Sequence, residues 1–124
     1  MNLVRQTQKA SNAQLKELLN SDSLLRRAAA MDEISNRLQT GFDDNLLKFL
    51  SDAVCEKRNR ETFVRGTITV AHVGMFALAR INHFKAREKF LSLLSIFKDD
   101  DLKDLIWDLE SESISIAFPE LQTA

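Results

Sequence analysis

The sequence predicts an all-α protein of about six helices, and three observations lead to that prediction. Glycine and proline are scarce, with three Gly and one Pro in 124 residues, so turns that need a positive φ angle must be few. Apolar residues recur at three- and four-residue intervals, which is the spacing of one helix face. The length suits one core. We therefore expect a single α-helical domain over 1–124, with a frayed N-terminus at 1–10 and a tail at 114–124.

The first half of the chain contains three helix signals, each opened by a residue that commonly caps helices. Ser11 opens a helix that ends at Leu19, and Ser23 opens a second that ends at Gly41. Asp43 or Asp44 opens a third helix, which ends in the polar stretch 56–60. The predicted inner residues are Leu15, Leu18 and Leu19 in the first, Leu24, Leu25, Ala28, Ala29, Met31, Ile34 and Leu38 in the second, and Leu46, Leu47, Leu50, Ala53 and Val54 in the third.

The second half predicts three more helices. The stretch 61–81 is apolar around most of a helical circumference, as expected of an element between neighbours, and Gly66 and Gly74 are interpreted as points of close packing. Its Thr and Val content would also allow strands. A fifth helix over 86–97 is followed by a sixth over 102–112, opened by three aspartates whose charge suits a helix N-terminus.

Three aliphatic-basic pairs recur at a regular distance along the chain. They are Leu25-Arg26, Val64-Arg65 and Leu102-Lys103, separated by 39 and 38 residues, and each opens the second helix of a predicted pair. This pattern resembles HEAT repeats, in which an amphipathic helix is followed by a turn and a second helix that begins with such a pair. The resemblance covers about 15–112 and implies stacked helical hairpins, a HEAT-like α-solenoid. The alternative is an irregular helical bundle.

The formal net charge of −1 conceals an uneven distribution of charge. Residues 1–53 are balanced, residues 54–98 carry nine basic and three acidic side chains, and residues 99–124 carry one basic and eight acidic side chains. Such a separation of charge bears on partners and association rates rather than on the fold.

The sixth predicted helix is expected to carry an acidic stripe, and this is the preferred partner-binding surface. At 100° per residue, four carboxylates share one side while leucines occupy another. Trp107 lies beyond the acidic stripe, where it either packs against the C-terminal tail or is an exposed anchor for a partner. A solvated face with no partner is the alternative interpretation. The candidate binding residues are Asp101, Asp104, Trp107, Asp108 and Glu112.

A basic patch after the fourth predicted helix supports a rival interpretation. His83 and Phe84 are interleaved with cationic side chains, a combination that suits contact with phosphate groups. The slight negative charge of the whole chain argues against nucleic acid, and the patch equally suits pairing with the acidic helix of its own chain. The candidate phosphate-binding residues are Arg80, Lys85, Arg87 and Lys89.

The motifs of enzymes, metal sites and cofactor sites are missing from the sequence. His72 and His83 are eleven residues apart and fit no metal-ligand spacing, and His72 is expected to be a packed core residue. Cys55 has no neighbouring His to activate it as a nucleophile and cannot form an intramolecular disulfide. The apolar stretch 63–81 is interrupted by charged and polar residues, so no membrane span is expected.

The sequence therefore predicts a non-enzymatic, cytoplasmic, protein-binding module without metal or cofactor. In type it resembles the small immunity proteins that neutralise bacterial toxins, many of which are basic nucleases, and the resemblance implies capture of a basic toxin by an acidic helix face. An adaptor subunit of a larger complex, and a HEAT-like nucleic-acid binder that uses residues 80–89, are the alternatives.

Overall fold

The computed structural model describes residues 2–111 and confirms an all-α protein with one small hairpin. It contains more elements than the six helices predicted. In chain order they are α1 (Leu3–Lys9), α2 (Asn12–Leu19), α3 (Leu24–Thr40), α4 (Asp44–Cys55), α5 (Lys57–Glu61), β1 (Phe63–Arg65), β2 (Ile68–Thr69), α6 (Val70–Ala79), α7 (Phe84–Leu93), a 3-10 turn η1 (Leu94–Ile96) and α8 (Asp99–Ser111).

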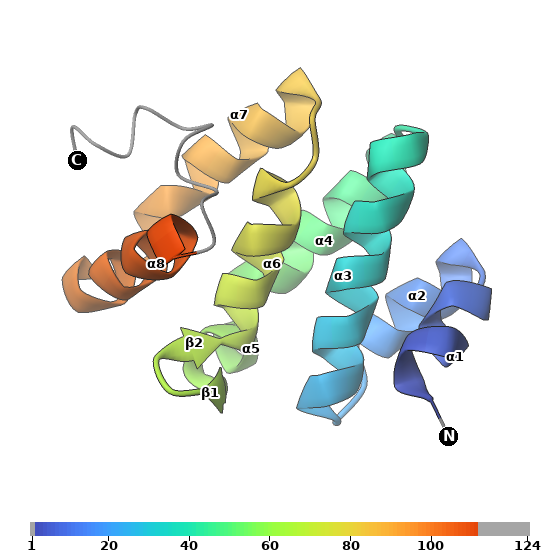
Figure 1. Ribbon diagram of the computed structural model, residues 1–124, viewed down its shortest axis with the longest axis horizontal. Coiled ribbons are helices and arrows are strands. Elements are labelled where there is room, and N and C mark those ends of the chain that lie inside the picture. The colour runs from blue at the N-terminus through green and yellow to red at the C-terminus, as the bar shows by residue number, and fades with distance from the viewer. Residues whose placement is uncertain (1, 112–124) are drawn as a thin grey trace.

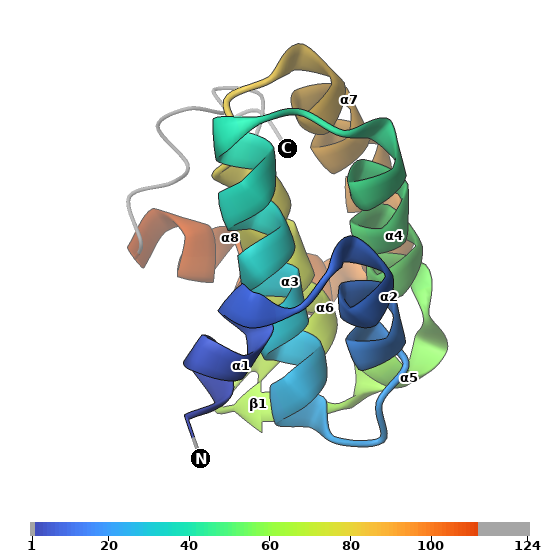
Figure 2. The same cartoon turned by 90° about the vertical axis from the view of Figure 1, so that its right-hand side faces the viewer.

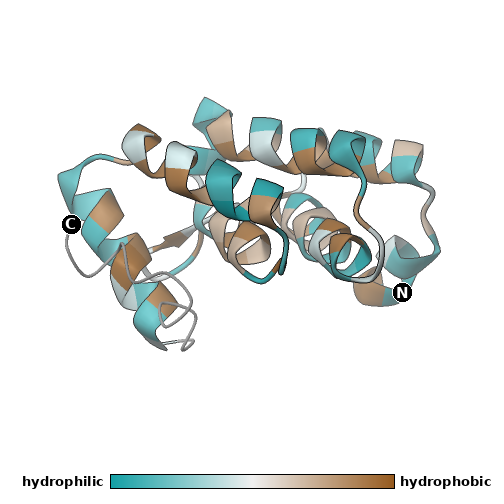
Figure 3. Ribbon diagram, turned by 90° about the horizontal axis from the view of Figure 1, so that it is seen from above, coloured by the Kyte–Doolittle hydropathy of each residue, from teal (hydrophilic) through white to brown (hydrophobic). Residues whose placement is uncertain are grey.

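The longer helices form two layers, which Figure 1 shows from the side of α3 and α6. Helices α3 and α6 lie next to each other in one layer, while α2, α4 and α7 form the other layer behind them (Figures 1 and 2). Helix α4 packs against both α3 and α6. Viewed from above, both layers carry apolar segments (Figure 3). Helix α8 runs across the direction of α3 and α6 and lies beside the hairpin.

The predicted N-terminal caps of the first three long helices are confirmed. The Ser11 hydroxyl accepts the backbone N–H of Gln14, and the Gln14 side chain accepts the N–H of Ser11, which completes a capping box. Ser23 caps α3 and Asp43 caps α4 in the same way, each by accepting first-turn N–H groups. Leu25 was predicted to face inward and is instead exposed, because α3 buries the opposite side of its first turn.

Residues 3–9 form helix α1, where the sequence analysis expected only a frayed segment. Asn2 caps its start, and Arg37 of α3 binds its other end. The Arg37 guanidinium donates to the carbonyls of Thr7, Gln8 and Ala10, and also to Asn12 and Glu33. A seven-residue helix is marginal by itself, so this tertiary contact, which the local sequence does not show, accounts for α1.

Replacing Arg37 with Met should therefore release α1 while leaving the rest of the fold in place. We expect the free energy of unfolding to fall by about 1.5 kcal/mol, the typical contribution of hydrogen bonds to a charged group. Amide hydrogen exchange should become faster in α1 alone. Asn36→Met, an exposed position of the same helix, is the control and should leave exchange unchanged. Uniform faster exchange across all helices in Arg37→Met would contradict this role.

The prediction of one continuous helix over 61–81 is wrong for its first half. The chain forms the short helix α5, turns through the hairpin β1–β2 and begins α6 only at Val70. Gly66 has a φ angle of 50° and lies in the two-residue hairpin loop, a conformation that favours glycine. Its interpretation as a close-packing point is also wrong, since a Cβ atom there would meet nothing within 4 Å.

The hairpin also changes the proposed repeat. Val64-Arg65, the middle aliphatic-basic pair, lies in strand β1 rather than at the start of a helix. Thr69 ends β2 and caps α6, with its hydroxyl accepting the N–H of His72. The resemblance to HEAT repeats stays a prediction, and the 39-residue spacing does not mark equivalent positions in the first two helix pairs.

The core centres on α6, which is buried on nearly all sides as its apolar composition predicted. Gly74 lies against Val54 of α4 and Met31 of α3, so its interpretation as a close-packing point is confirmed. Around it the fully buried large side chains come from both layers and from α8: Leu15, Met31, Ile34, Leu50, Val54, Val70, His72, Met75, Leu78, Phe90, Leu105 and Leu109.

The last two predicted helices are shifted at their starts. Helix α7 begins at Phe84 rather than Ala86, and it ends at Leu93 before the 3-10 turn η1. Helix α8 begins at Asp99, so the three aspartates form its first turn instead of preceding it. The predicted tail at 114–124 and Glu112 lie outside the described residues.

Candidate functional site

Helix α8 is anchored to the domain by one apolar side. Leu105 and Leu109 are fully buried, and Leu102 and Ile106 pack beside them against the core. Asp99, Asp100 and Asp101 occupy the first turn, where the positive end of the helix dipole stabilises carboxylates. The opposite side of α8 therefore projects into solvent from a helix with a fixed orientation.

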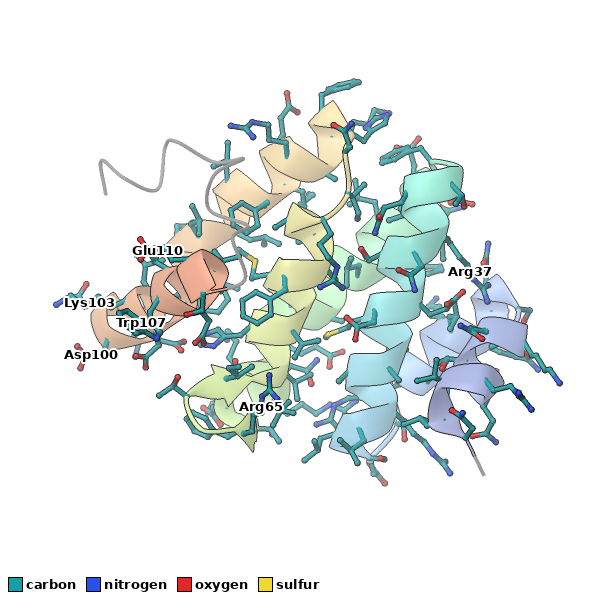
Figure 4. All side chains as sticks on the ribbon, viewed as in Figure 1. Arg37, Arg65, Asp100, Lys103, Trp107 and Glu110 are labelled. Atoms are coloured by element: carbon teal, nitrogen blue, oxygen red, sulfur yellow. The ribbon has the colours of Figure 1, made fainter. Side chains whose placement is uncertain are left out.

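Trp107 is the most exposed large apolar side chain of the described residues, with 69% of its surface accessible. It lies on the side of α8 that points away from α6, together with Asp100, Lys103 and Glu110 (Figure 4). These four residues, which we call the outer face of α8, are separated by three or four positions and so share one helix surface. Trp107 is thus exposed, and the alternative in which it packs against the C-terminal tail lies outside the described residues.

The described residues of the acidic stripe are less exposed than Trp107. Asp101, Asp104 and Asp108 are half-buried on the flank of α8, between its apolar side and its outer face. The helical projection of the sequence, at 100° per residue, correctly placed these carboxylates beside the leucines. It contained no information on the hairpin, which contacts α8 through β2, or on His72 of α6, which lies 2.9 Å from Asp101.

Asp101 is directed at the buried His72 of α6, whose side chain is 0% exposed. The Nδ1 atom of His72 accepts the backbone N–H of Thr69 at 3.4 Å, and its Nε2 atom lies 2.9 Å from Oδ1 of Asp101, although the N–H bond is not aligned with that oxygen. The prediction of His72 as a core residue is confirmed. Asp101 therefore brings the first turn of α8 against α6, and its role in binding a partner stays a prediction.

Asp108 lies in a hollow between the hairpin and α3, α6 and α8, together with two arginines, Arg65 and Arg80. Arg80 donates to Asp32 of α3 at 2.8 Å across the same hollow. The floor is apolar and includes Val73 and Phe76 of α6. Two acidic and two basic groups thus balance one another here, and the hollow has no net charge that would select an anion or a cation.

The four residues of the predicted basic patch have different environments. Arg80 pairs with Asp32, and Lys85 pairs with Asp44 of α4 at 3.1 Å. Arg87 is half-buried and Lys89 is exposed. The ion pairs of Arg80 and Lys85 are thus made with α3 and α4, and pairing of the patch with the acidic helix stays a prediction.

An aromatic cluster lies beside this patch, and the sequence indicated only two of its three members. His83 and Phe84 were noted there, but Phe42, which is distant in sequence, stacks on His83 with ring centroids 3.6 Å apart and an interplanar angle of 11°. Phe84 stacks on the same imidazole at 4.8 Å. The position of Phe42 directly before the cap of α4 gave no signal, because only the tertiary fold brings the two connections together.

Comparison of the chain with family models, with curated proteins and with solved structures finds no match. Within residues 2–111, no three His, Cys, Asp or Glu side chains are grouped so that they could hold a metal ion. None of the helices described is both long enough and apolar enough to traverse a bilayer. The candidate sites therefore rest on the geometry of this chain alone.

Proposed function

We propose that this protein is a non-enzymatic binding module that docks onto a basic surface of another protein through the outer face of α8. The exposed Trp107 carries the proposal, because tryptophan is enriched among the residues that dominate binding energy. The outer face carries two acidic side chains and one basic side chain, and the exposed Asp99 adds a carboxylate in the first turn, so a basic partner matches it in charge. Such complementarity speeds and orients association.

The anchoring of α8 supports this assignment. A docking residue binds more tightly when its helix is already ordered, since less freedom is lost on binding. Leu105 and Leu109 fix the helix from below, and Asp101 meets His72 at its first turn. The outer face is therefore presented in one orientation before any partner arrives.

The finer proposal is that the partner is a toxin, as in the immunity proteins that this chain resembles in type. Its test uses the basic proteins encoded beside this gene, each co-expressed with and without the chain. Rescue of growth inhibited by one of them supports neutralisation. Binding of such a neighbour without rescue supports an adaptor role instead, and binding of none of them overturns the immunity proposal.

For a neighbour that binds, Trp107→Ala should weaken the complex about tenfold or more, the effect typical of a central interface residue. Isothermal titration at low and high salt measures the dissociation constants, and urea unfolding checks that stability is unchanged. Leu25→Ala, an equally apolar truncation of an exposed residue on α3, is the control and should bind like the unmodified protein. An unchanged dissociation constant for Trp107→Ala removes the outer face from the binding site.

A further inference from the structure

A groove lies between α1 and α2, at the end of the molecule opposite to α8 (Figure 1). Figure 2 looks onto this end, where α1 and α2 lie in front of α3 and α4. The groove, which we call the α1–α2 groove, encloses about 620 Å³. This volume is in the range of pockets that hold drug-sized ligands, so an indole ring fits into it.

The α1–α2 groove combines apolar surface with a positive net charge. Its apolar lining is half-buried, and its charged lining is exposed and consists of two basic side chains and one acidic side chain. Within residues 2–111 none of these three charged side chains makes an ion pair. The apolar residues are Leu3, Ala10 and Leu18, and the charged residues are Lys9, Glu17 and Arg26.

The outer face of α8 has the complementary set of groups. Trp107 is 69% exposed and shares this face with two acidic side chains, Asp100 and Glu110, and one basic side chain, Lys103. All three charged side chains are exposed, and in the part of the chain that the structure describes they make no ion pair either. The outer face therefore carries a net charge of −1 against +1 in the α1–α2 groove.

Both surfaces are ordered before they meet a partner. Arg37 of α3 holds α1 through three backbone carbonyls, and the capping box of Ser11 and Gln14 fixes the start of α2. On the other side, Leu105 and Leu109 anchor α8 in the core. Little conformational freedom remains to be lost when such surfaces dock, which lowers the cost of association.

We infer that the outer face of α8 in one copy of this chain docks into the α1–α2 groove of a second copy. Trp107 enters the groove and covers its apolar lining, while Lys9 and Arg26 face the carboxylates of Asp100 and Glu110. A helix that lays an anchor residue into an apolar groove is a common mode of recognition. The inference rests on the proposed function, because it uses the same outer face, and it names another copy as a partner.

The placement of the two surfaces determines the kind of assembly. They lie at opposite ends of the longest axis, and the outer face points away from α6 (Figures 1 and 4). Each head-to-tail contact therefore leaves one groove and one outer face unoccupied, and further copies can add to them. Contacts of this type produce open chains or rings rather than symmetric dimers.

Sedimentation velocity of the full chain, from micromolar to millimolar concentration at low salt, measures the association. We expect the mean mass to rise past that of a dimer and to fall when salt screens the exposed charges. Trp107→Ala and Arg26→Glu should each weaken the association about tenfold or more, the effect typical of a central interface residue. Urea unfolding checks that both variants are folded.

Two control variants change similar side chains outside both surfaces. Phe84→Ala removes another exposed aromatic ring, and Lys89→Glu reverses another exposed basic side chain. Both should associate like the unmodified protein.

Mixing the two interface variants tests the head-to-tail contact directly. Trp107→Ala keeps an intact groove, and Arg26→Glu keeps an intact outer face. At concentrations where each variant alone is monomeric, the mixture should form one-to-one dimers that do not grow further. A symmetric contact between two α8 helices would instead survive in Arg26→Glu and would not be restored by mixing.

Three results would overturn the inference. The first is an unmodified chain that stays monomeric over the whole concentration range. The second is an association that stops at the dimer. The third is unchanged association in Arg26→Glu while its urea midpoint matches that of the unmodified protein.

The inference and the proposed function can fail separately. Arg26→Glu leaves the outer face of α8 intact, so a basic neighbour should bind this variant as tightly as it binds the unmodified protein. A neighbour that binds through Trp107 to a chain that is always monomeric overturns the inference alone. Self-association of a chain that binds no neighbour supports the inference and overturns only the immunity proposal.

Discussion

Asn59→Leu should destabilise the protein by about 1.5–3 kcal/mol, because a buried guanidinium loses a hydrogen-bond partner. Asn59 is 0% exposed, and its side-chain oxygen accepts the Nε–H of Arg27 at 2.8 Å. Arg27 is itself only 4% exposed, and burial, followed by the nearby Arg58, lowers the pKa of its guanidinium. Urea unfolding followed by circular dichroism measures the loss.

The double variant Arg27→Met with Asn59→Leu separates the charge from the packing. Removing both polar partners removes the unpaired charge, so stability should return in large part. Asn59 also donates to the Ala53 carbonyl at 2.8 Å, and Arg27 donates to that of Ser21, so recovery is expected to be incomplete. A double variant as unstable as Asn59→Leu would show that the amide acts through Ala53 rather than through Arg27.

Gly74→Ala should destabilise the protein by about 1–3 kcal/mol, although alanine is the better helix former. The added Cβ atom would overlap Cγ2 of Val54 and lie 3.3 Å from Sδ of Met31, where three core helices meet. Thermal and urea unfolding measure the change. Combining Gly74→Ala with Val54→Ala removes the main clash, and we expect the two changes to be less harmful together than their sum.

Gly41→Ala is the matched control for Gly74→Ala. A Cβ atom at Gly41 meets nothing within 4 Å, and the backbone there has φ −162°, which any residue adopts. The expected effect lies within about 0.5 kcal/mol of zero. Equal destabilisation by the two substitutions would mean that glycine acts through chain flexibility and not through helix packing.

Local signals in the sequence were reliable where a helix carries its own cap. Ser11, Ser23 and Asp43 each open the predicted helix, because capping is an interaction between residues three positions apart at most. The periodicity of apolar residues predicted the wrong structure at 61–69, because a run of apolar and β-branched residues suits both a buried helix and a hairpin. The Arg-Gly-Thr sequence at 65–67 was the available sign of a turn.

The candidate surfaces were predicted only in part. The sequence selected α8 and Trp107, and it grouped the basic residues after α6. It did not show that Asp101 turns inward to His72, or that Phe42 joins His83 and Phe84. Periodicity describes one helix at a time, whereas both of these contacts join segments about 30 and 40 positions apart.

By itself the sequence determined the all-α class, the main helix starts and the separation of charge along the chain, since these depend on composition and on near neighbours. Only the tertiary structure decided which of these charged side chains face solvent. Packing α8 across the hairpin and α6 turns its acidic flank toward its own chain and leaves Trp107 outside. The α3–α4 and α6–α7 connections meet, which places Phe42 on His83 beside Phe84. Both outcomes follow from contacts between distant segments, whose strength depends on geometry that no local pattern contains.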